Sequence, residues 1–370
     1  MRLADISAPQ WRALAMRATE PNGYYLPDWE LAIDASARGR VGAFALGAWS
    51  DTAELTGLMP VISMWRAYKI PLPALVSADP YGSLSTPLLD RDHAEQAAAE
   101  ILRQARRSGA HALVLRDTSL DGAAMKAFTA RRHRPARAAI ARPRRAGCER
   151  DADELLRDSL GQKKLKELRR QRHRLADHGN VHFDVARTYA EVAAALETFL
   201  VLEASGWKAK RGTALVQDEG DAAFIRRATP ALAAGGQCEI VTLKTGEKPV
   251  ASAIVLRHLD RAFYFKLGVD ERFARFSPGV QLTLELTRHL CADPAIASAD
   301  STANADHPMI NPIWRGRLAI GDVLIPLRRR DPVAALVGSA LTLRRLAREP
   351  ARRAVRFIRN RKSHRQEKSA

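Results

Sequence analysis

Two polar residues that follow a predicted strand could perform acid–base chemistry. An apolar strand is expected over residues 296–300, it ends at Asp300, and His307 follows in a polar loop. Histidine titrates near neutrality, and a proton acceptor of this kind lets an amine react as the free base. We therefore take Asp300 and His307 together as the candidate general base. Tyr264, on an earlier strand, is a candidate proton donor, although a strand tyrosine more often only packs in a core.

A predicted helix start between these residues could bind an anion. Ser277 suits the N-cap, Pro278 suits the first helical position, and Gly279 follows without a side chain. The N–H groups of Gly279, Val280 and Gln281 then lack partners within the helix and lie at the positive end of its dipole. A pyrophosphate would fit there, whereas most helix starts bind only water.

Three further side chains could contact a ligand. Lys266 alternates with Phe265 and Leu267 on a predicted strand and could meet a phosphate or a carboxylate. The alternative is a structural lysine in a salt bridge. Trp207 and Lys208 follow a predicted helix end in a short loop, where they could contact an acceptor or a cofactor. In the alternative, Trp207 packs on the sheet and Lys208 faces solvent.

A strongly basic helix is predicted over residues 159–179. Ser159 and Gln162 have capping-box spacing, and Gly179 suits the C-terminal position that favours positive φ. Residues 163–174 hold seven Lys or Arg and one acid, which solvent exposure alone does not explain. We expect this helix to line a groove for an anionic acceptor. The residues expected to line the groove are Lys166, Arg169 and Arg170.

The basicity of the chain is confined to three segments. Its 370 residues carry 59 Lys and Arg against 41 Asp and Glu, a net charge of +18. Residues 131–145, 163–174 and 328–370 carry net charges of +7, +6 and +11, so the remaining chain is acidic. This distribution disfavours nucleic acid as the partner of the whole surface. The last segment is either a solvated terminus or a contact with anionic lipid.

Other classes of protein are excluded by what the sequence lacks. No stretch approaches the roughly 18 apolar residues of a membrane span, and the first residues include no apolar leader. Cys148, Cys238 and Cys291 are far apart and form no CxxC pair, so neither a zinc site nor a disulfide framework is supported. We therefore expect a cytoplasmic protein without a metal.

Strands and helices alternate along the chain, which predicts an α/β fold with three parts. Residues 1–145 would form an N-terminal domain, residues 146–327 a second domain, and residues 328–370 a basic helical tail. In the first domain we expect strands over residues 41–49, 55–65 and 111–116 and helices over residues 92–108 and 121–132. In the second we expect helices over residues 159–179, 188–205, 218–233 and 277–291 and strands over residues 181–187, 237–244, 249–258, 262–267, 296–300 and 318–325.

Several segments of the second domain resemble the GNAT superfamily of acyl-CoA N-acyltransferases. More specifically, they are similar to its CelD-like, polysaccharide-associated branch, which is related to the fold of the Fem peptidyl transferases. The segments are residues 159–179, 203–214 (EASGWKAKRGTA), 264–270 (YFKLGVD), 277–282 (SPGVQL), 300–303 and 307–309 ahead of Trp314. The chain departs from the general motif at Phe276 and Ser277, where an Arg-Gly step is usual, and at Gln281, which replaces a glycine.

The resemblance implies two GNAT-like units in tandem, the first degenerate, with mixed, mostly antiparallel sheets flanked by helices. It implies acyl-CoA, acetyl-CoA first, as the co-substrate and no metal. In that mechanism the strand over residues 262–267 hydrogen-bonds the pantetheine arm, and the amide at the strand's end polarises the thioester carbonyl. The cofactor-binding residues that the resemblance implies are Lys266, Leu267, Gly268, Ser277, Gly279, Val280 and Gln281.

These features predict an acyl-CoA-dependent N-acyltransferase. Its acceptor would be an amine, or less often a hydroxyl, of an anionic molecule related to polysaccharide or the cell envelope. The basic tail would place the enzyme in the cytoplasm or against the inner membrane surface. Two alternatives remain: a non-catalytic protein that binds anions or nucleic acid on a degenerate GNAT scaffold, and a Fem-like transferase that uses aminoacyl-tRNA.

Overall fold

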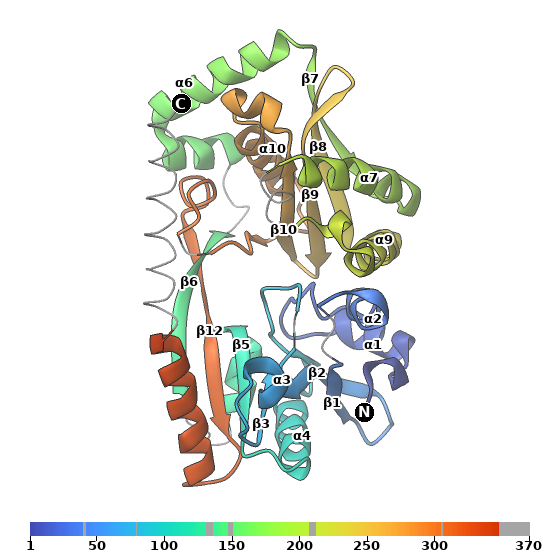
Figure 1. The fold of residues 1–370 in the computed structure, drawn as a ribbon, viewed down its shortest axis with the longest axis vertical. Helices are drawn as coiled ribbons and strands as arrows, with labels where there is room; N and C mark the ends of the chain where they lie inside the picture. The colour runs from blue at the N-terminus through green and yellow to red at the C-terminus, as the bar shows by residue number, and fades with distance from the viewer. Residues whose placement is uncertain are drawn as a thin grey trace.

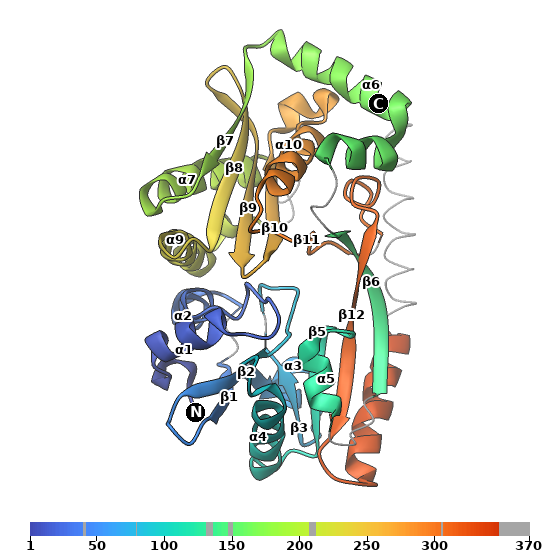
Figure 2. The same cartoon turned by 180° about the vertical axis from the view of Figure 1, so that it is seen from behind.

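The computed structural model describes residues 1–39, 42–78, 80–130, 136–146, 151–206, 212–304 and 306–347. The elements gather in two halves, which lie one above the other in Figure 1. Two long strands, β6 (Ala136–Ala146) and β12 (Gly316–Pro326), run side by side along one side of the molecule in Figures 1 and 2 and reach both halves.

The N-terminal half packs short helices against a small sheet. Its strands are β1 (Phe44–Trp49), β2 (Leu55–Ser63), β3 (Ala74–Ser77), β4 (Leu88–Leu89) and β5 (Ala112–Ser119). Its helices are η1 (Leu3–Asp5), α1 (Ala8–Met16), α2 (Pro27–Ser36), α3 (Met64–Tyr68), α4 (Ala94–Arg107) and α5 (Ala123–Thr129). The burial of α4 follows its sequence: the small and aliphatic residues Ala97, Ala98, Ile101, Leu102 and Ala105 face the sheet.

The second half contains an antiparallel meander flanked by helices. Its strands are β7 (Val181–Ala186), β8 (Cys238–Thr245), β9 (Lys248–His258), β10 (Arg261–Val269) and β11 (Ser298–Asp300). Its helices are α6 (Ala152–Ala176), α7 (Tyr189–Ser205), η2 (Leu215–Gln217), α9 (Glu219–Ala234), η3 (Glu271–Phe276) and α10 (Pro278–Ala292).

All these strands belong to one mixed sheet. Its order is β1-β2-β3-β5-β12-β6-β11-β10-β9-β8-β7, with β4 paired to β2. Among the described strands, β3–β5 and β10–β11 pair in parallel and the other neighbours are antiparallel. The predicted fold class, mixed and mostly antiparallel sheet flanked by helices, is therefore confirmed.

The last strand lies in an unexpected place. The strand predicted over residues 318–325 was expected to complete the second domain, but β12 pairs with β5 of the N-terminal half on one side and with β6 on the other. Likewise β6, which overlaps the basic segment 131–145, is a central strand of the sheet. The two strands join the halves into a single sheet, and the domain boundaries at residues 145 and 327 stay predictions.

An aromatic cluster also joins the halves. Trp29 of α2 lies edge-on to Phe224 of α9 and to Phe265 of β10, each with ring centroids 4.9 Å apart. Tyr24, which precedes α2, lies edge-on to Phe263 at 5.6 Å. Because these rings are largely removed from water, their burial stabilises the halves against one another.

Helix ends followed the sequence in one case and departed from it in another. The capping box of Thr188 and Glu191 is present, since Thr188 Oγ1 accepts from the Glu191 N–H and Glu191 Oε2 accepts from the Thr188 N–H. The capping box predicted at Ser159 is wrong, because α6 begins earlier, with Asp151 as its N-cap. Instead, α6 kinks at Gly161, whose φ of 73° and ψ of 160° lie outside the helical region.

Candidate active site

Strand β10 opens away from its neighbour halfway along its length. It pairs with β9 throughout, with a register shift between Tyr264 and Lys266. In the part of the chain that the structure describes, it pairs with β11 only over Arg261–Phe263. Thr302 takes the place of the missing partner strand, since its Oγ1 donates to the carbonyl oxygen of Tyr264 over 2.7 Å. The strands therefore part at Tyr264.

A cavity of about 470 Å³ lies where the strands part; we call it the β10–β11 cavity. It is formed by the end of α7, the second part of β10, η3 and the segment after β11. Its lining residues are Leu202, Glu203, Gly206, Tyr264, Phe265, Lys266, Leu267, Gly268, Val269, Glu271, Ala274, Ser301, Thr302, Ala303, His307, Met309 and Ile310. Two of the three predicted catalytic residues, Tyr264 and His307, are among them.

Tyr264 is built to keep its proton. Its side chain is buried, and burial raises the pKa of the phenol to about 12. Its hydroxyl lies 3.3 Å from Thr283 Oγ1, and Thr283 itself donates to the carbonyl of Gly279. Since the hydroxyl of Thr283 has only one hydrogen, Tyr264 must be the donor in their bond. The hydroxyl of Tyr264 is thus directed to Thr283 of α10, while the residue itself is among those that line the cavity.

His307 is half-buried in the loop after β11, and burial lowers its pKa. The imidazole is therefore neutral at pH 7. Its Nδ1 accepts from the N–H of Ile310 over 3.3 Å, which leaves the single ring proton on Nε2. Nδ1 is consequently its proton-accepting atom.

Asp300 is separated from the cavity. It is fully buried at the end of β11, and its Oδ1 accepts from the N–H of Thr302 over 2.8 Å. It does not line the cavity with His307. The geometry therefore gives Asp300 a role in holding the turn of Thr302, in place of the predicted joint role with His307 as base.

Lys266 lines the cavity as half of an ion pair. Its Nζ lies 3.1 Å from Oε1 of Glu203, a side chain of α7 that is withdrawn from solvent. The second oxygen of Glu203 accepts from the N–H of Leu215 over 3.0 Å. The pair places compensated charges in the wall and ties β10 to α7 and η2.

Leu267 and Gly268, both predicted to bind the cofactor, also line the cavity. Gly268 is a point of close approach between strand and helix, since a Cβ placed there would lie 2.8 Å from the backbone nitrogen of Glu203. Glycine is thus needed here for packing, independently of any ligand.

The predicted anion site at the start of α10 is smaller than expected. Ser277 is the N-cap, but its φ of 52° is left-handed and its side chain makes no cap bond. The N–H of Gln281 donates to the carbonyl of Ser277, so only Gly279 and Val280 keep first-turn N–H groups without such a helical acceptor. The side chain of Gln281 is buried and donates to Leu168 of α6 over 2.7 Å. Gln281 therefore joins α10 to α6 instead of facing a ligand.

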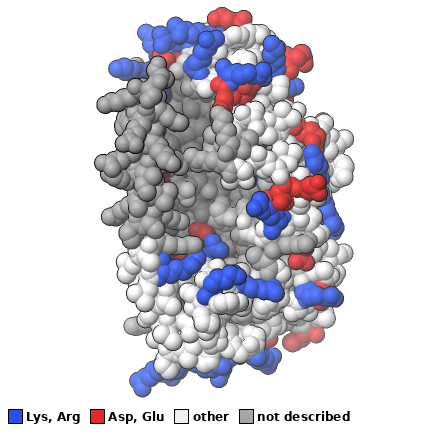
Figure 3. Space-filling model, viewed as in Figure 1, with Lys and Arg blue, Asp and Glu red and all other residues white. Residues whose placement is uncertain are grey.

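The predicted acceptor residues of α6 are all exposed. Lys166, Arg169 and Arg170 lie on its outer face, and of these Arg170 pairs with Glu167 at 2.8 Å. Figure 3 shows Lys and Arg side chains gathered at the end of the molecule where Figure 1 places this helix. The outer face of α6 is therefore basic. The helix itself packs against η3 and α10. Trp207 and Lys208 lie outside the described residues.

Glu203 and Thr302 are the residues of this site that sequence reasoning missed. Both lie in segments that carried the family resemblance, but nothing in their spacing showed that one would neutralise Lys266 and the other would cap the carbonyl of Tyr264. The available signal for Glu203 was a glutamate placed directly after the apolar run of residues 199–202.

One family model matches the segment that supplies most residues of this cavity. Residues 162–307 match the family described as acetyltransferase (GNAT) domain. No curated protein sequence matches the chain significantly.

Solved structures with similar folds cover nearly the whole chain. One is the C-terminal domain (DUF2156) of a putative lysylphosphatidylglycerol synthetase from Agrobacterium fabrum, with 13% identity and a TM-score of 0.54 over 90% of this chain and 95% of that one. Another is FemX, with 12% identity and a TM-score of 0.55 over 86% of this chain and 96% of that one. A protein of unknown function from Bacteroides thetaiotaomicron is similar at 12% identity and a TM-score of 0.53, over 88% and 98%.

At these identities the structural likeness shows the fold alone. Together with the domain match over residues 162–307, it shows that the chain has a GNAT-like fold. None of the helices in the described part of the chain is long and apolar enough to cross a membrane. Within the same residues, no cluster of three or more His, Cys, Asp or Glu could hold a metal ion.

Proposed function

We propose that this protein transfers an acyl group from acyl-CoA, acetyl-CoA first, to an amine of an anionic acceptor related to polysaccharide or the cell envelope. The observation that carries this proposal is the parting of β10 from β11 at Tyr264, which opens a mostly apolar cavity beside a strand edge. An extended pantetheine arm could lie along β10 there, next to Leu267 and Gly268. The N–H groups of Gly279 and Val280 and the exposed Arg275 are the proposed contacts for its phosphates.

The chemistry assigned to this cavity needs one proton acceptor and one proton donor. The amine nitrogen attacks the thioester carbon and forms a C–N bond, and the C–S bond then breaks. Neutral His307 takes the proton that the amine loses, through Nδ1, which must first release the N–H of Ile310. Tyr264 keeps its proton at neutral pH and can give it to the departing thiolate. Asp300 acts through the turn of Thr302.

The basic face of α6 is the proposed docking site for the acceptor. Lys166 and Arg169 lack ion pairs with other described residues, so their charges remain available to an acidic sugar or a phosphate. Trp207 and Lys208 stay proposed acceptor contacts.

The tail suggests that the reaction takes place against the inner membrane surface, from the cytoplasm. The helix over residues 332–347 buries Ala334 and Val337 but exposes Leu336, Leu343 and Leu346. Apolar side chains of this kind, together with the net charge of +11 over residues 328–370, suit the surface of an anionic bilayer.

The experiment that tests the transfer reaction uses thiol release. The purified chain is incubated with acetyl-CoA and a panel of amino sugars and uronic acids that carry amines, and free CoA is measured. We expect acetyl-CoA to raise the melting temperature, because it binds only the folded state. We also expect at least one amine that carries an acidic group to accelerate thiol release. Neither a thermal response nor turnover with any acceptor would contradict the proposal.

An aminoacyl-tRNA donor is the second candidate, which the fold of FemX and the basic face of α6 both favour. It predicts tRNA-dependent transfer of an amino acid and no thiol release. The third candidate, a non-catalytic binder of nucleic acid, predicts duplex affinity that falls steeply with salt and no response to acetyl-CoA.

A further inference from the structure

A second cavity, of about 740 Å³, lies at the other end of β10, between the two halves. We call it the inter-half cavity. The segment before α2, the loop that starts α5, the β9–β10 turn and the start of β12 form its walls. Its lining residues are Ala18, Thr19, Glu20, Pro21, Arg91, Ser119, Asp121, Gly122, Ala123, Leu259, Asp260, Arg261, Arg317, Leu318 and Ala319.

Charged groups of both signs line this cavity. The six are Glu20, Asp121, Asp260, Arg91, Arg261 and Arg317. Elsewhere in the protein, acids and bases that share a surface usually meet, as Lys266 and Glu203 do. Here none of the six forms an ion pair with another residue of the described chain. The cavity therefore holds opposite charges apart.

Arg261 is the cation whose position most needs a partner. The residue is 8% exposed, its Nε donates to Ser298 Oγ over 3.1 Å, and its Nη1 is enclosed without a hydrogen-bond acceptor among the described residues. Arg91 and Arg317 differ, because both are exposed and donate to backbone carbonyls. A buried guanidinium without a counter-charge is costly, and an anion in the cavity would remove that cost.

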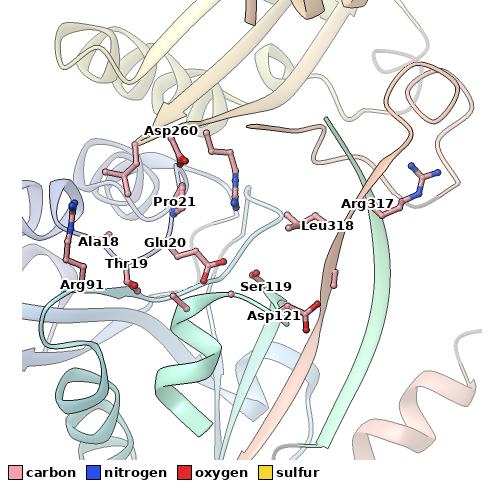
Figure 4. Close-up of a pocket in the computed structure, with 15 residues that line it drawn as sticks. Ala18, Thr19, Glu20, Pro21, Arg91, Ser119, Asp121, Asp260, Arg317 and Leu318 are labelled. Atoms are coloured by element: carbon pink, nitrogen blue, oxygen red, sulfur yellow. The ribbon is translucent and has the colours of Figure 1, made fainter. Parts of the chain in front are cut away.

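The carboxylates lie on the other walls. Figure 4 shows Glu20, Ser119 and Asp121 together on the side of the N-terminal half, with Asp260 across the cavity and Arg317 directed away from Glu20 and Asp121. Glu20 is buried and accepts from the N–H of Ala124, while Asp121 and Asp260 are exposed. These acids would repel a ligand that carried only negative charge.

The walls are held in place by a neutral histidine next to the cavity. His258, at the end of β9, accepts at Nδ1 from the N–H of Asn22 over 2.8 Å. Its Nε2–H donates to the carbonyl of Ala15 over 2.9 Å. Both partners belong to the N-terminal half, so the separation between Arg261 and the acids is fixed by the fold.

We propose that the inter-half cavity binds a small zwitterion, with its carboxylate or phosphate against Arg261 and its ammonium against Glu20 and Asp121. The ligand class is thus an amino acid or an amino-alcohol phosphate. This site lies at the opposite end of β10 from the β10–β11 cavity and does not depend on the proposed transfer reaction.

Calorimetric titration of the full chain tests the proposal. The probes are glycine and phosphoethanolamine, with acetate and methylammonium as single-charge controls of similar size. We expect at least one zwitterion to bind about tenfold or more tightly than both controls, because only a zwitterion satisfies both walls. Glycine binding assigns a carboxylate to Arg261, and phosphoethanolamine binding assigns a phosphate.

Three variants locate the binding. Arg261→Met keeps the aliphatic stem and removes the charge, and Asp121→Asn removes an exposed carboxylate that forms no hydrogen bond or ion pair with the described residues. Both should weaken the zwitterion at least about tenfold. Arg106→Met, with the same charge change on the exposed face of α4, should bind as the unaltered chain does. Asp121→Asn decides the question even where Arg261→Met fails to fold. Absence of zwitterion binding, or binding unaffected by Asp121→Asn, would overturn the proposal.

Discussion

The two ends of β10 carry cavities of opposite character. At the end that follows Tyr264, the β10–β11 cavity is mostly apolar, and its cation Lys266 is neutralised by Glu203. At the end that starts with Arg261, the inter-half cavity is lined by six charges that form no ion pairs within the described chain. One strand thus builds two environments. In the β10–β11 cavity the charges are paired within the fold, which suits an uncharged chain and an acyl group. In the inter-half cavity the charges are kept apart, which suits a charged ligand.

The largest effect is expected from removing the proposed proton acceptor of the β10–β11 cavity, His307. His307→Ala should lower turnover about 100-fold or more, because the proposed mechanism assigns acceptance of the amine proton to this side chain. Binding of acetyl-CoA, measured by thermal shift, should be unchanged. The control is His182→Ala, on the half-buried edge strand β7. Full activity of His307→Ala would show that the cavity is not the catalytic site.

The contacts of His258 next to the inter-half cavity should make the stability of the fold depend on pH. Burial lowers the pKa of His258 to about 4, against 6.5 in an unfolded chain. The unfolded state therefore binds this proton first, and the stability that neutral His258 provides is complete above pH 6.5 and lost as pH falls toward 4. The loss from this group is roughly 3 kcal/mol.

Urea unfolding at pH 7.5 and pH 5 measures this effect, with His258→Gln as the comparison. The variant should be less stable than the unaltered chain at pH 7.5 and should lose less stability on acidification. Equal acid sensitivity of the two proteins would exclude His258 as the titrating link between the halves.

Packing at the β10–β11 cavity can be tested without any ligand. Gly268→Ala places a Cβ 2.8 Å from the backbone of Glu203 and should destabilise the fold by about 1–3 kcal/mol. Gly338→Ala is the matched control, since its Cβ would meet only Leu324 at 3.9 Å and alanine favours a helix. Urea unfolding of both variants decides the matter. Equal stability would mean that α7 does not pack on β10 as described.

The smallest effect is expected on the outer face of α6. Replacing Lys166, Arg169 and Arg170 with alanine should raise the KM for an acidic acceptor several-fold and leave the thermal response to acetyl-CoA unchanged. The effect should shrink in high salt, because exposed charges are screened. Alanine at Arg103, Arg106 and Arg107 of α4 provides a triple control with the same loss of charge. Unchanged acceptor kinetics in the α6 variant would exclude this face as the docking site.

Local signals in the sequence predicted local structure well. The strands β8, β9 and β10 and the start of α10 at Pro278 depend on neighbouring residues, which the sequence displays directly. Gly161 shows the limit of such signals. Gly161 lies at the predicted start of a helix, but the observed helix begins earlier, at Ala152, and is kinked at Gly161.

Pairings between distant segments could not be predicted in this way. That β12 pairs with β5 depends on which edges remain open once both halves have folded, and no spacing in the sequence encodes that competition. The same holds for the site. Tyr264 and His307 were found by their residue types, but the withdrawal of Asp300 into a turn and the pairing of Lys266 with Glu203 depend on contacts across the fold.

A structure determined with bound CoA tests the central claim most directly. We predict that the pantetheine arm lies along β10 where it parts from β11, with the sulfur between Tyr264 and His307 and the phosphates toward the start of α10 at Gly279. CoA bound elsewhere, such as on the basic face of α6 or in the inter-half cavity, would contradict the assignment of the β10–β11 cavity as the active site.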